Sequence, residues 1–329
     1  ERDEKVPTCT QAPMNSHSRL LAILLLLISF PLSAQRVVWW NVENLFDCHH
    51  DSLRQDYDFL PQGSHRWTPR RYWHKMDNIS RTLAALCPND TEWPMLIGLG
   101  EVENDTVLRD LTRRSPLRVA NYAYVHYEGP DVRGIDCALL YQPHLFGLLG
   151  SESIRVPSEE YKMRATRDLL HCWGVLAGGD TLHVICIHFP SRAGGTRTSA
   201  LHRKLAVETL CTLLEGIGDE KILVMGDFNA NADDPALRDI VERMVLLTPT
   251  GRKEKRKPQG TYCYRGLWEY IDHILVSKSL SPYCSERITV GRLPFLLTRE
   301  GVPYRTFLGP SYQGGISDHL PIWADLFIR

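Results

Sequence analysis

The sequence predicts a layered α/β protein, and three observations lead to this prediction. Apolar runs of strand length recur along the chain, and several are apolar at nearly every position, as expected of strands buried on both faces. Segments with helical patterning lie between them, which is typical of helices that cover a sheet. The chain has 329 residues, 43% of them hydrophobic, and is therefore long enough to bury a large core. We expect one main domain at residues 35–329, after an N-terminal extension and signal peptide at residues 1–34.

Residues 1–34 show the order of segments found in a secretory signal. Arg19 precedes an apolar run at residues 20–30, and small residues follow at the end of the segment. The run of about eleven residues is shorter than the ~20 residues that span a bilayer. Acidic residues before Met14 indicate that Met14 is the initiator. We therefore expect an exported protein, periplasmic or extracellular, with a retained membrane anchor or a buried hydrophobic helix as the alternatives.

The predicted elements alternate along the main domain. Seven apolar runs are predicted strands, at residues 37–40, 95–99, 137–141, 183–187, 221–225, 271–276 and 320–326. Four segments between them are predicted helices, at residues 70–86, 105–114, 198–214 and 235–245. The third helix carries leucines on or near one face, consistent with packing against a sheet: Leu201, Leu205, Leu210 and Leu214.

Charge and cysteine content exclude some classes of function. The formal net charge of -1 excludes a strong overall attraction to a polyanion, so any field that binds phosphate must be local. The basic run at residues 252–257 is a predicted exposed loop, either solvated or in contact with a phosphate backbone. The nine cysteines form no CxxC pair, which argues against thiolate zinc sites. Cys137 and Cys186 are predicted to be buried thiols. Export would allow one or two disulfides to form among the cysteines.

Polar residues flank the ends of the apolar runs, where sheet scaffolds usually hold sites. The segments are 40–44 (Trp-Asn-Val-Glu-Asn), 100–104 (Gly-Glu-Val-Glu-Asn), 187–192 (Ile-His-Phe-Pro-Ser-Arg), 226–229 (Gly-Asp-Phe-Asn), 270–273 (Tyr-Ile-Asp-His) and 317–319 (Ser-Asp-His). Taken alone, Asp227 fits an ordinary turn and Glu101 fits a helix N-terminus. His188 and His319 fit hydrogen-bonded core histidines. Their joint occurrence in this order favours a functional site.

Taken in order, these motifs resemble those of the endonuclease/exonuclease/phosphatase superfamily. The resemblance rests on Asn41, Glu101, His188, Gly226-Asp227-x-Asn229, Asp272 and Ser317-Asp318-His319, and it covers residues 36–328. The superfamily includes pancreatic-type DNases, AP endonucleases, neutral sphingomyelinases and inositol-polyphosphate phosphatases. The resemblance implies a DNase I-like four-layer αββα sandwich, with two mixed β-sheets flanked by helices and the site at one end of the sheets.

The resemblance also implies catalytic roles for five residues. His319 is the expected acid/base or phosphate-contacting imidazole, and Asp272 would fix its tautomer and favour its protonated form. Asp227 would orient the attacking water or a metal ion, and Asn229 would donate to the phosphate. His188 matches a histidine that contacts the scissile phosphate. His273 points to the opposite face of the strand from Asp272, and we expect it to be structural.

Phosphodiester hydrolysis needs a hard cation that neutralises the phosphate, and Mg²⁺ (or Mn²⁺) is the expected cofactor. Glu101 is the first expected ligand, and Asn41 would complete or support the metal site, as the matching Asn does in the family. Asp318 and Asp227 would help to hold the ion. Arg192 is a candidate substrate-binding donor to the phosphate, or else a surface arginine.

Departures from the family pattern bear on the substrate. Gly100 stands where many relatives carry Gln, and His188-Phe-Pro190-Ser191 differs from the AP endonuclease pattern, which argues against abasic-site repair. The motifs look closer to those of secreted bacterial nucleases. We therefore expect a nuclease that hydrolyses DNA or RNA, so that nucleic acid is the expected partner and no stable protein partner is implied.

Two alternatives stay open from the sequence alone. One is a phospholipid or phosphoinositide phosphoesterase, similar to sphingomyelinases, which would contact a membrane. The other is an inactive binding module that keeps the sandwich. An aromatic hairpin that inserts into a membrane would favour the lipid hypothesis. Residues 57–73 are rich in aromatic side chains, but basic residues lie among them, which suits nucleic acid at least as well.

Overall fold

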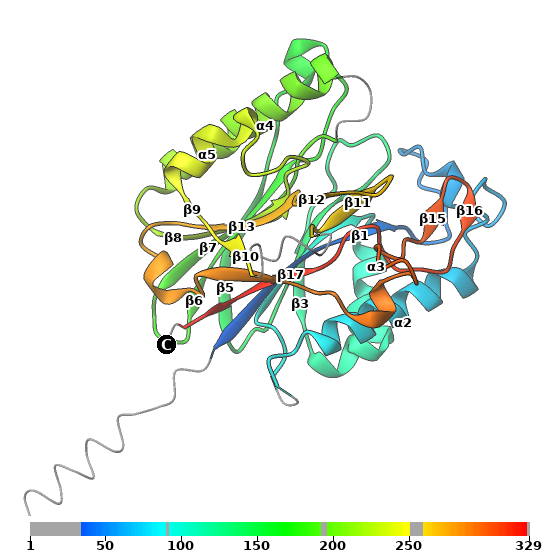
Figure 1. The fold of residues 1–329 in the computed structure, drawn as a ribbon, viewed down its shortest axis with the longest axis horizontal. Helices are drawn as coiled ribbons and strands as arrows, with labels where there is room; N and C mark the ends of the chain where they lie inside the picture. Colours follow the sequence, from blue (N-terminus) through cyan, green and yellow to red (C-terminus); the bar gives the residue numbers. More distant parts are fainter. Residues whose placement is uncertain (1–33, 90–91, 192–195, 251–258, 328–329) are drawn as a thin grey trace, which may run out of the picture. The chain divides into compact units, whose positions relative to one another are not determined.

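Two β-sheets form the framework of the molecule (Figure 1). In the described part of the chain, one sheet has seven strands in the order β10-β14-β17-β1-β2-β4-β3, and the other has six in the order β5-β6-β7-β8-β13-β9. Both sheets are mixed, because β1 runs parallel to β2 and β7 runs parallel to β8, whereas β1 with β17 and β8 with β13 are antiparallel. Two separate hairpins are formed by β11 with β12 and by β15 with β16.

The computed structural model describes residues 34–89, 92–191, 196–250 and 259–327, without the side chains of residues 196–199. The strands are β1 (Gln35–Leu45), β2 (Leu96–Val102), β3 (Ala123–His126), β4 (Asp136–Tyr141), β5 (Phe146–Ile154), β6 (Leu169–Leu176), β7 (Thr181–His188), β8 (Lys221–Asp227), β9 (Val245–Leu246), β10 (Thr248–Pro249), β11 (Tyr262–Tyr264), β12 (Leu267–Glu269), β13 (Asp272–Val276), β14 (Arg287–Val290), β15 (Phe307–Leu308), β16 (Ser311–Tyr312) and β17 (Ile322–Leu326).

The helices flank the two sheets. The α-helices are α2 (Pro69–Ala85), α3 (Asp105–Arg109), α4 (Thr196–Ile217) and α5 (Arg238–Arg243), and the π-helical turn η2 (Asp110–Arg114) continues α3. Short 3₁₀ turns are η1 (Tyr57–Phe59), η3 (Pro116–Ala120), η4 (Glu159–Tyr161), η5 (Pro235–Leu237), η6 (Ser281–Tyr283) and η7 (Pro294–Leu296). None of the described helices is long and apolar enough to cross a membrane.

Alternation of side chains along the strands sets the order of the layers. In β1, Trp39 packs between the two sheets together with Met225 of β8, whereas the next residue, Trp40, packs on the opposite face against Ile79 of α2. A third core joins the outer face of the second sheet to Leu210 of α4. Three apolar cores separate four layers, and Figure 1 shows α4 and α5 on one side and α2 and α3 on the other. The predicted four-layer sandwich is therefore confirmed.

Most predicted elements correspond to observed ones, with local differences. Each predicted strand overlaps an observed strand, and helices α2 and α4 extend over nearly the predicted ranges. The helix predicted at residues 235–245 is shorter, because a 3₁₀ turn forms its start and the chain enters β9 at Val245. Leu201 of α4 is 42% exposed, so the apolar face of this helix rests on its other three leucines.

Two further expectations are corrected. Residues 57–73 do not form an exposed aromatic surface, because Trp67 and Tyr72 are buried in the core between α2 and its sheet and Phe59 packs against that core. All eight cysteines from Cys48 to Cys284 are free thiols, so no disulfide forms among the described residues. The signal-like segment, Arg192 and the basic run at residues 252–257 lie outside the described residues.

Candidate active site

Neighbouring strand ends bring the polar motifs together at one end of the two sheets. Because β7 is parallel to β8 and β13 is antiparallel to β8, residues His188, Asp227 and Asp272 are register partners in three adjacent strands. In the other sheet, β1 and β2 are parallel and carry Asn41 and Glu101 at their C-terminal ends. Thus residues far apart in the sequence share one end of the sandwich.

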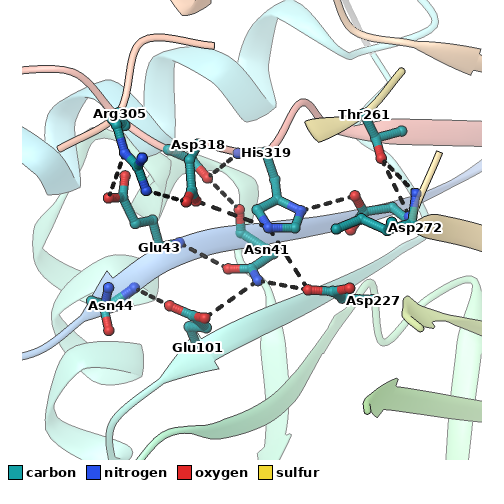
Figure 2. Close-up of polar contacts among 12 residues, drawn as sticks. Asn41, Glu43, Asn44, Glu101, Asp227, Thr261, Asp272, Arg305, Asp318 and His319 are labelled. Carbon is teal, nitrogen blue, oxygen red and sulfur yellow. Dashed lines mark hydrogen bonds and ion pairs between the residues drawn. The ribbon is translucent and has the colours of Figure 1, made fainter. Parts of the chain in front are cut away.

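His319 and Asp272 form a buried hydrogen-bonded pair (Figure 2). His319 Nδ1 lies 2.9 Å from Asp272 Oδ2, and Trp39 Nε1 donates to the other oxygen, Asp272 Oδ1, over 2.9 Å. Trp40 Nε1 donates to the carbonyl oxygen of His319 over 3.0 Å. These contacts fix the imidazole with Nδ1 as the donor, so that Nε2 faces the pocket and lies 3.7 Å from Asp227 Oδ2.

The charges of this group set its protonation state. Burial lowers the pKa of His319, but the carboxylates of Asp272 and Asp227 outweigh it and hold that pKa well above its ordinary value. Burial raises the pKa of Asp227 to about 7, although the neighbouring His319 partly offsets this shift. At neutral pH, His319 is therefore a charged donor, and Asp227 is poised to gain or lose a proton.

Asp227 is the centre of a wider hydrogen-bond network. Its Oδ2 accepts from Asn41 Nδ2 over 3.1 Å and lies 3.5 Å from His188 Nε2, and its Oδ1 accepts from the backbone N–H of Asn229 over 2.9 Å. Asn229 also donates from Nδ2 to the carbonyl oxygen of Phe189 over 2.9 Å. The amide of Asn229 is thereby held at the pocket, with one N–H engaged.

Arg167 holds the end of β7 in place and was missed by the sequence analysis. It donates to the carbonyl oxygens of His188 and Phe189 over 3.3 and 2.8 Å, and it pairs with Asp131 over 3.1 Å. Burial, with the adjacent Arg167 charge, holds the pKa of His188 well below its ordinary value, so the imidazole is neutral. No sequence motif distinguishes Arg167, because its role depends on two backbone carbonyl groups in another strand.

Glu101 offers the freest carboxylate of the site. Its Oε2 accepts from the backbone N–H of Asn44 over 2.7 Å, and its Oε1 lies 3.5 Å from Asn41 Nδ2 and 4.0 Å from His188 Nε2. The Asn41 amide oxygen is occupied by the backbone N–H of Glu43 over 3.0 Å. Asn41 therefore presents its nitrogen to both carboxylates and organises them, and its role as a metal ligand stays a prediction.

Left-handed backbone conformations cluster around these groups. Glu101 has a φ of 64°, Glu43 and Asn44 each have a φ of 52°, and Asn229 has a φ of 50°. Non-glycine residues in this region are strained, and such strain concentrates at functional sites. The register of β2 shifts on both sides of Glu101, which turns its side chain toward the pocket.

Glu43 and Arg305 also belong to the site, although neither was assigned from the sequence. Arg305 Nη2 donates to Asp318 Oδ2 over 2.6 Å, and Arg305 Nε lies 3.8 Å from Glu43 Oε1. Glu43 follows Asn41 by two residues in the same strand end, which is the signal that could have identified it. Arg305 lies in an irregular segment with no periodic pattern. The metal-binding role of Asp318 stays a prediction, because its carboxylate pairs with Arg305.

Two places in the pocket are candidates to bind a divalent cation. The ligand atoms of Asp227, Asp272 and His319 lie within 4.8 Å of one another, close enough for a metal ion. However, both oxygens of Asp272 and Nδ1 of His319 are already engaged in hydrogen bonds, as in a proton-transfer pair. Glu101, with oxygen ligands of the type Mg²⁺ prefers, is the better candidate to hold the ion.

These side chains line an open pocket of about 610 Å³. Aromatic and basic residues complete its walls. Tyr262 of the β11–β12 hairpin lies against His319 with ring centroids 4.9 Å apart, and Tyr264 of the same hairpin is 49% exposed. Arg133 and Ser191 also line the pocket, and Arg192, the next residue, lies outside the described ones. His273 is buried away from it, with Nε2 2.9 Å from the carbonyl oxygen of Ala230.

Comparison with known proteins assigns this site to a family. The model of the endonuclease/exonuclease/phosphatase family matches residues 36–327, nearly the whole described domain. The chain belongs to this family. Members of the endonuclease/exonuclease/phosphatase family are typically phosphoester hydrolases, and they generally depend on a divalent metal ion. Among proteins of curated function, none is a significant match to this sequence.

Solved structures of several family proteins share the fold. D. rerio TDP2 complexed with a single-strand DNA product has 14% identity, covers 89% of this chain and 98% of its own, and has a TM-score of 0.57. The human nocturnin catalytic domain with a bound sulfate anion has 18% identity, covers 89% of this chain and 92% of its own, and has a TM-score of 0.53. An endonuclease/exonuclease/phosphatase family protein from Bacteroides thetaiotaomicron has 16% identity, covers 89% of this chain and 97% of its own, and has a TM-score of 0.55. At these identities, the likeness establishes the fold.

Proposed function

We propose that the protein is an exported, divalent-metal-dependent phosphodiesterase that hydrolyses DNA or RNA. One observation carries the proposal. The charged His319, the proton-accepting Asp227 and the carboxylate of Glu101 face the same pocket, His319 from the loop before β17 and the two carboxylates from the ends of β8 and β2. Hydrolysis of a phosphodiester needs these three elements in one place: a proton acceptor, a donor to the phosphate and a carboxylate for a hard cation.

The geometry supports a specific division of labour. Water adds to phosphorus and the bond to the leaving oxygen breaks, so a proton must leave the water and a proton must reach the leaving group. Asp227 accepts the proton of the water, because its pKa of about 7 suits a base at neutral pH. His319 transfers its Nε2 proton to the leaving oxygen as the bond to phosphorus breaks, and Asp272 holds the imidazole with Nε2 facing the pocket.

The metal site is proposed at Glu101. Asn41 places its amide nitrogen between the carboxylates of Glu101 and Asp227, which keeps the two apart and correctly oriented. A Mg²⁺ or Mn²⁺ ion bound there would neutralise the phosphate and stabilise the charge of the transition state. The neutral His188, buried between the same carboxylates, is expected to face the phosphate oxygen.

A nucleic acid substrate is favoured by the walls of the pocket. Tyr262 and Tyr264 offer aromatic faces beside His319, and stacking on a base contributes about 1–3 kcal/mol. Arg133, which is 42% exposed, adds a cationic donor to the same pocket. Residues 57–73 bury Trp67 and Tyr72 and therefore favour neither a lipid nor a nucleic acid. TDP2, which shares this fold, has been observed with a DNA product.

Export is the second part of the proposal. Its support is the order of basic, apolar and small residues in segment 1–34. Expression of the full chain in a bacterial host, followed by separation of periplasm and cytoplasm, would test it. We expect a shortened protein in the periplasm, and a full-length product that stays in the cytoplasm would contradict export.

The substrate is tested by parallel assays of the purified protein on plasmid DNA, RNA and sphingomyelin. Each assay includes Mg²⁺, Mn²⁺, Ca²⁺ or EDTA, and His319→Ala is the control. We expect metal-dependent cleavage of nucleic acid that the variant lacks. Activity on sphingomyelin alone would replace the nuclease proposal with the lipid one, and binding of nucleic acid without hydrolysis of any substrate would favour an inactive binding module.

A further inference from the structure

Three arginines line the pocket within the described ranges, and they differ in how many of their donors are already used: Arg133, Arg167 and Arg305. Arg305 Nη2 donates to Asp318 over 2.6 Å at the edge of the site. The buried Arg167 uses Nε, Nη1 and Nη2 in bonds to an aspartate and to two backbone carbonyl oxygens at the end of β7. Arg133 differs from both, because neither of its Nη atoms has a hydrogen-bond partner among the residues that the structure describes.

Asp131 holds the other side of the Arg133 guanidinium group. Asp131 Oδ1 accepts from the backbone N–H of Arg133 over 2.9 Å and lies 3.4 Å from Arg133 Nε. Its Oδ2 accepts from Arg167 Nη1 over 3.1 Å. The loop is anchored as well, since the backbone N–H of Gly134 and Arg54 Nη1 donate to the carbonyl oxygen of Asp131 over 2.9 and 3.2 Å. The Nε side of Arg133 is thus fixed, and its two Nη groups remain for a ligand.

The charges around Asp131 do not cancel. Burial raises the pKa of Asp131, but the charges of Arg167 and Arg133 outweigh it and hold this pKa below its ordinary value, so the carboxylate is ionised. Among the described side chains, no other carboxylate lies within 4.0 Å of either guanidinium group. Two guanidinium groups therefore share one carboxylate, which leaves one positive charge. Because Arg167 is 5% exposed and Arg133 is 42% exposed, a ligand meets this charge at Arg133.

Arg133 lies on the side of the pocket that His188 occupies. His188 Nε2 and His319 Nε2 approach one oxygen, Asp227 Oδ2, at 3.5 and 3.7 Å, so the two imidazoles flank the proposed place of hydrolysis. Burial lowers the pKa of His188, and the charges of Arg167 and Arg133 lower it further, which shows that Arg133 is near this imidazole. The described part of the chain places no arginine nitrogen within 4.0 Å of the Asp227 carboxylate. Arg133 therefore lies beside the reacting group and not against it.

We propose that Arg133 binds a second phosphate, the one next to the bond that is hydrolysed, and thereby selects substrates that carry neighbouring phosphates. Two free Nη groups on one planar guanidinium match two oxygens of a phosphate. A nucleic acid strand presents such phosphates along its backbone, whereas a diester with a single phosphate, such as sphingomyelin, does not. This inference rests on the proposed function and narrows its substrate class.

Thymidine esters that differ by one phosphate test the inference. One pair is thymidine 3′-(p-nitrophenyl phosphate) with and without a 5′-phosphate, and the other is thymidine 5′-(p-nitrophenyl phosphate) with and without a 3′-phosphate. Release of nitrophenolate in the presence of Mg²⁺ or Mn²⁺ gives kcat and KM for each ester. For the wild type, we expect the added phosphate to raise kcat/KM by about 10–100-fold in one of the two pairs, mainly through a lower KM, as hydrogen bonds to a charged group do.

Arg133→Met should abolish this preference, and Arg133→Lys should keep part of it, because lysine retains the charge but not the fork of donors. The matched control is Arg287→Met, which changes an exposed arginine outside the pocket and should keep the wild-type preference. Circular dichroism shows whether each variant is folded.

A wild type without preference in either pair, or a folded Arg133→Met variant that keeps the full preference, would overturn the inference and leave the proposed function intact. If the wild type hydrolysed none of the four esters with either metal ion, the proposed function itself would fail.

Discussion

Asp272 shows how much one residue of this site depends on its neighbours. Trp39 and His319 donate to its two oxygens, and the backbone N–H of Asp272 donates to Thr261 Oγ1 over 3.3 Å. Trp39 can take this position because Gly98 lies under its ring, where an added Cβ would be 2.8 Å from the indole. The orientation of the catalytic histidine is therefore built into the packing between the two sheets.

Asp272→Asn should lower the rate of hydrolysis by about 10²–10⁴-fold, the usual contribution of a positioned acid or base. The amide removes the negative charge that raises the pKa of His319, so this pKa should fall as well. NMR titration of the His319 ring alongside the rate measurement checks both effects. If the rate fell while the titration of His319 stayed unchanged, the assigned pairing would be wrong.

Asp136 makes the stability of the domain depend on pH. Burial raises its pKa to about 7 from its ordinary value of 3.8, although the backbone N–H of Gly129 donates to it over 2.8 Å. Because the folded pKa is the higher one, the contribution of Asp136 to stability is complete below about 4 and is lost as the pH rises through 7. Asp136→Asn should therefore lose less stability than the wild type between pH 5 and about 8.

Urea unfolding of both proteins at several pH values measures this difference. Asp219→Asn, a change at an exposed position, is the control and should follow the wild type. Parallel pH profiles of Asp136→Asn and the wild type would show that the carboxyl group of Asp136 is not protonated in the folded state.

Single residues differ in how visible they are in the sequence. Asn41, Glu101, His188, Asp227 and His319 flank apolar runs in the sequence, and the structure brings four of them to one pocket, with Asn41 hydrogen-bonded to Asp227 beside it. Glu43 follows Asn41 by two residues and could have been assigned from the alternation of a strand. The role of Arg305 could not be predicted, because it depends on contacts with a strand more than 250 residues earlier in the chain.

At the scale of elements, the parallel pair β7 and β8 carries the centre of the site. Gly226 precedes Asp227 and lies directly against β7. A Cβ atom at this position would be 2.2 Å from Ile187 Cγ1 and 2.4 Å from the carbonyl oxygen of Ile187. Only glycine allows the two strands to approach in this way, so the Gly-Asp sequence is needed by the packing as well as by the chemistry.

Gly226→Ala should reduce the free energy of unfolding by about 1–3 kcal/mol, as overpacking does in a filled core. It should also lower activity, because the shift of β8 moves Asp227. Gly216→Ala is the matched control, since its Cβ meets no atom within 4 Å and it lies in the last turn of α4. The free energy of unfolding of this control should stay within about 0.5 kcal/mol of the wild type. Denaturant unfolding measures the free energy of unfolding of both variants. Equal stability of Gly226→Ala and Gly216→Ala would contradict the packing argument.

Elements with strong periodicity were predictable, and those defined by long-range pairing were not. The central strands are continuously apolar, and α2 and α4 have a clear apolar face. By contrast, β5 and β6 contain glycine, serine and histidine, so that their sequences do not read as buried strands. The hairpin of β11 and β12, which brings Tyr262 to His319, is three residues long on each side and has no periodic signal.

At the scale of the whole molecule, the fold and the family follow from the order of the motifs. Many separate strand ends and loops contribute to one pocket, and an isolated motif would not have identified it. The family match over residues 36–327 confirms that the motifs belong together. What the sequence could not predict is the balance of charge in the pocket, because this balance depends on which acidic groups are paired with an arginine.

That balance predicts a stabilising effect of the metal ion on the whole domain. An ion that binds only the folded state at 100 times its Kd adds about 2.7 kcal/mol to stability. We expect Mg²⁺ or Mn²⁺ to raise the Tm of the wild type and EDTA to reverse the rise. Glu101→Gln should abolish the shift, because it removes the uncompensated carboxylate. Differential scanning calorimetry measures the change in Tm. An equal rise in the Tm of Glu101→Gln would show that the ion binds elsewhere.

Hydrolysis of a chromogenic aryl phosphodiester tests the central claim most directly, because it separates the chemistry of the site from the choice of natural substrate. The account predicts hydrolysis that requires Mg²⁺ or Mn²⁺, stops with EDTA and falls by about 10²–10⁴-fold in His319→Ala. Equal rates for the wild type and a folded His319→Ala variant would contradict it.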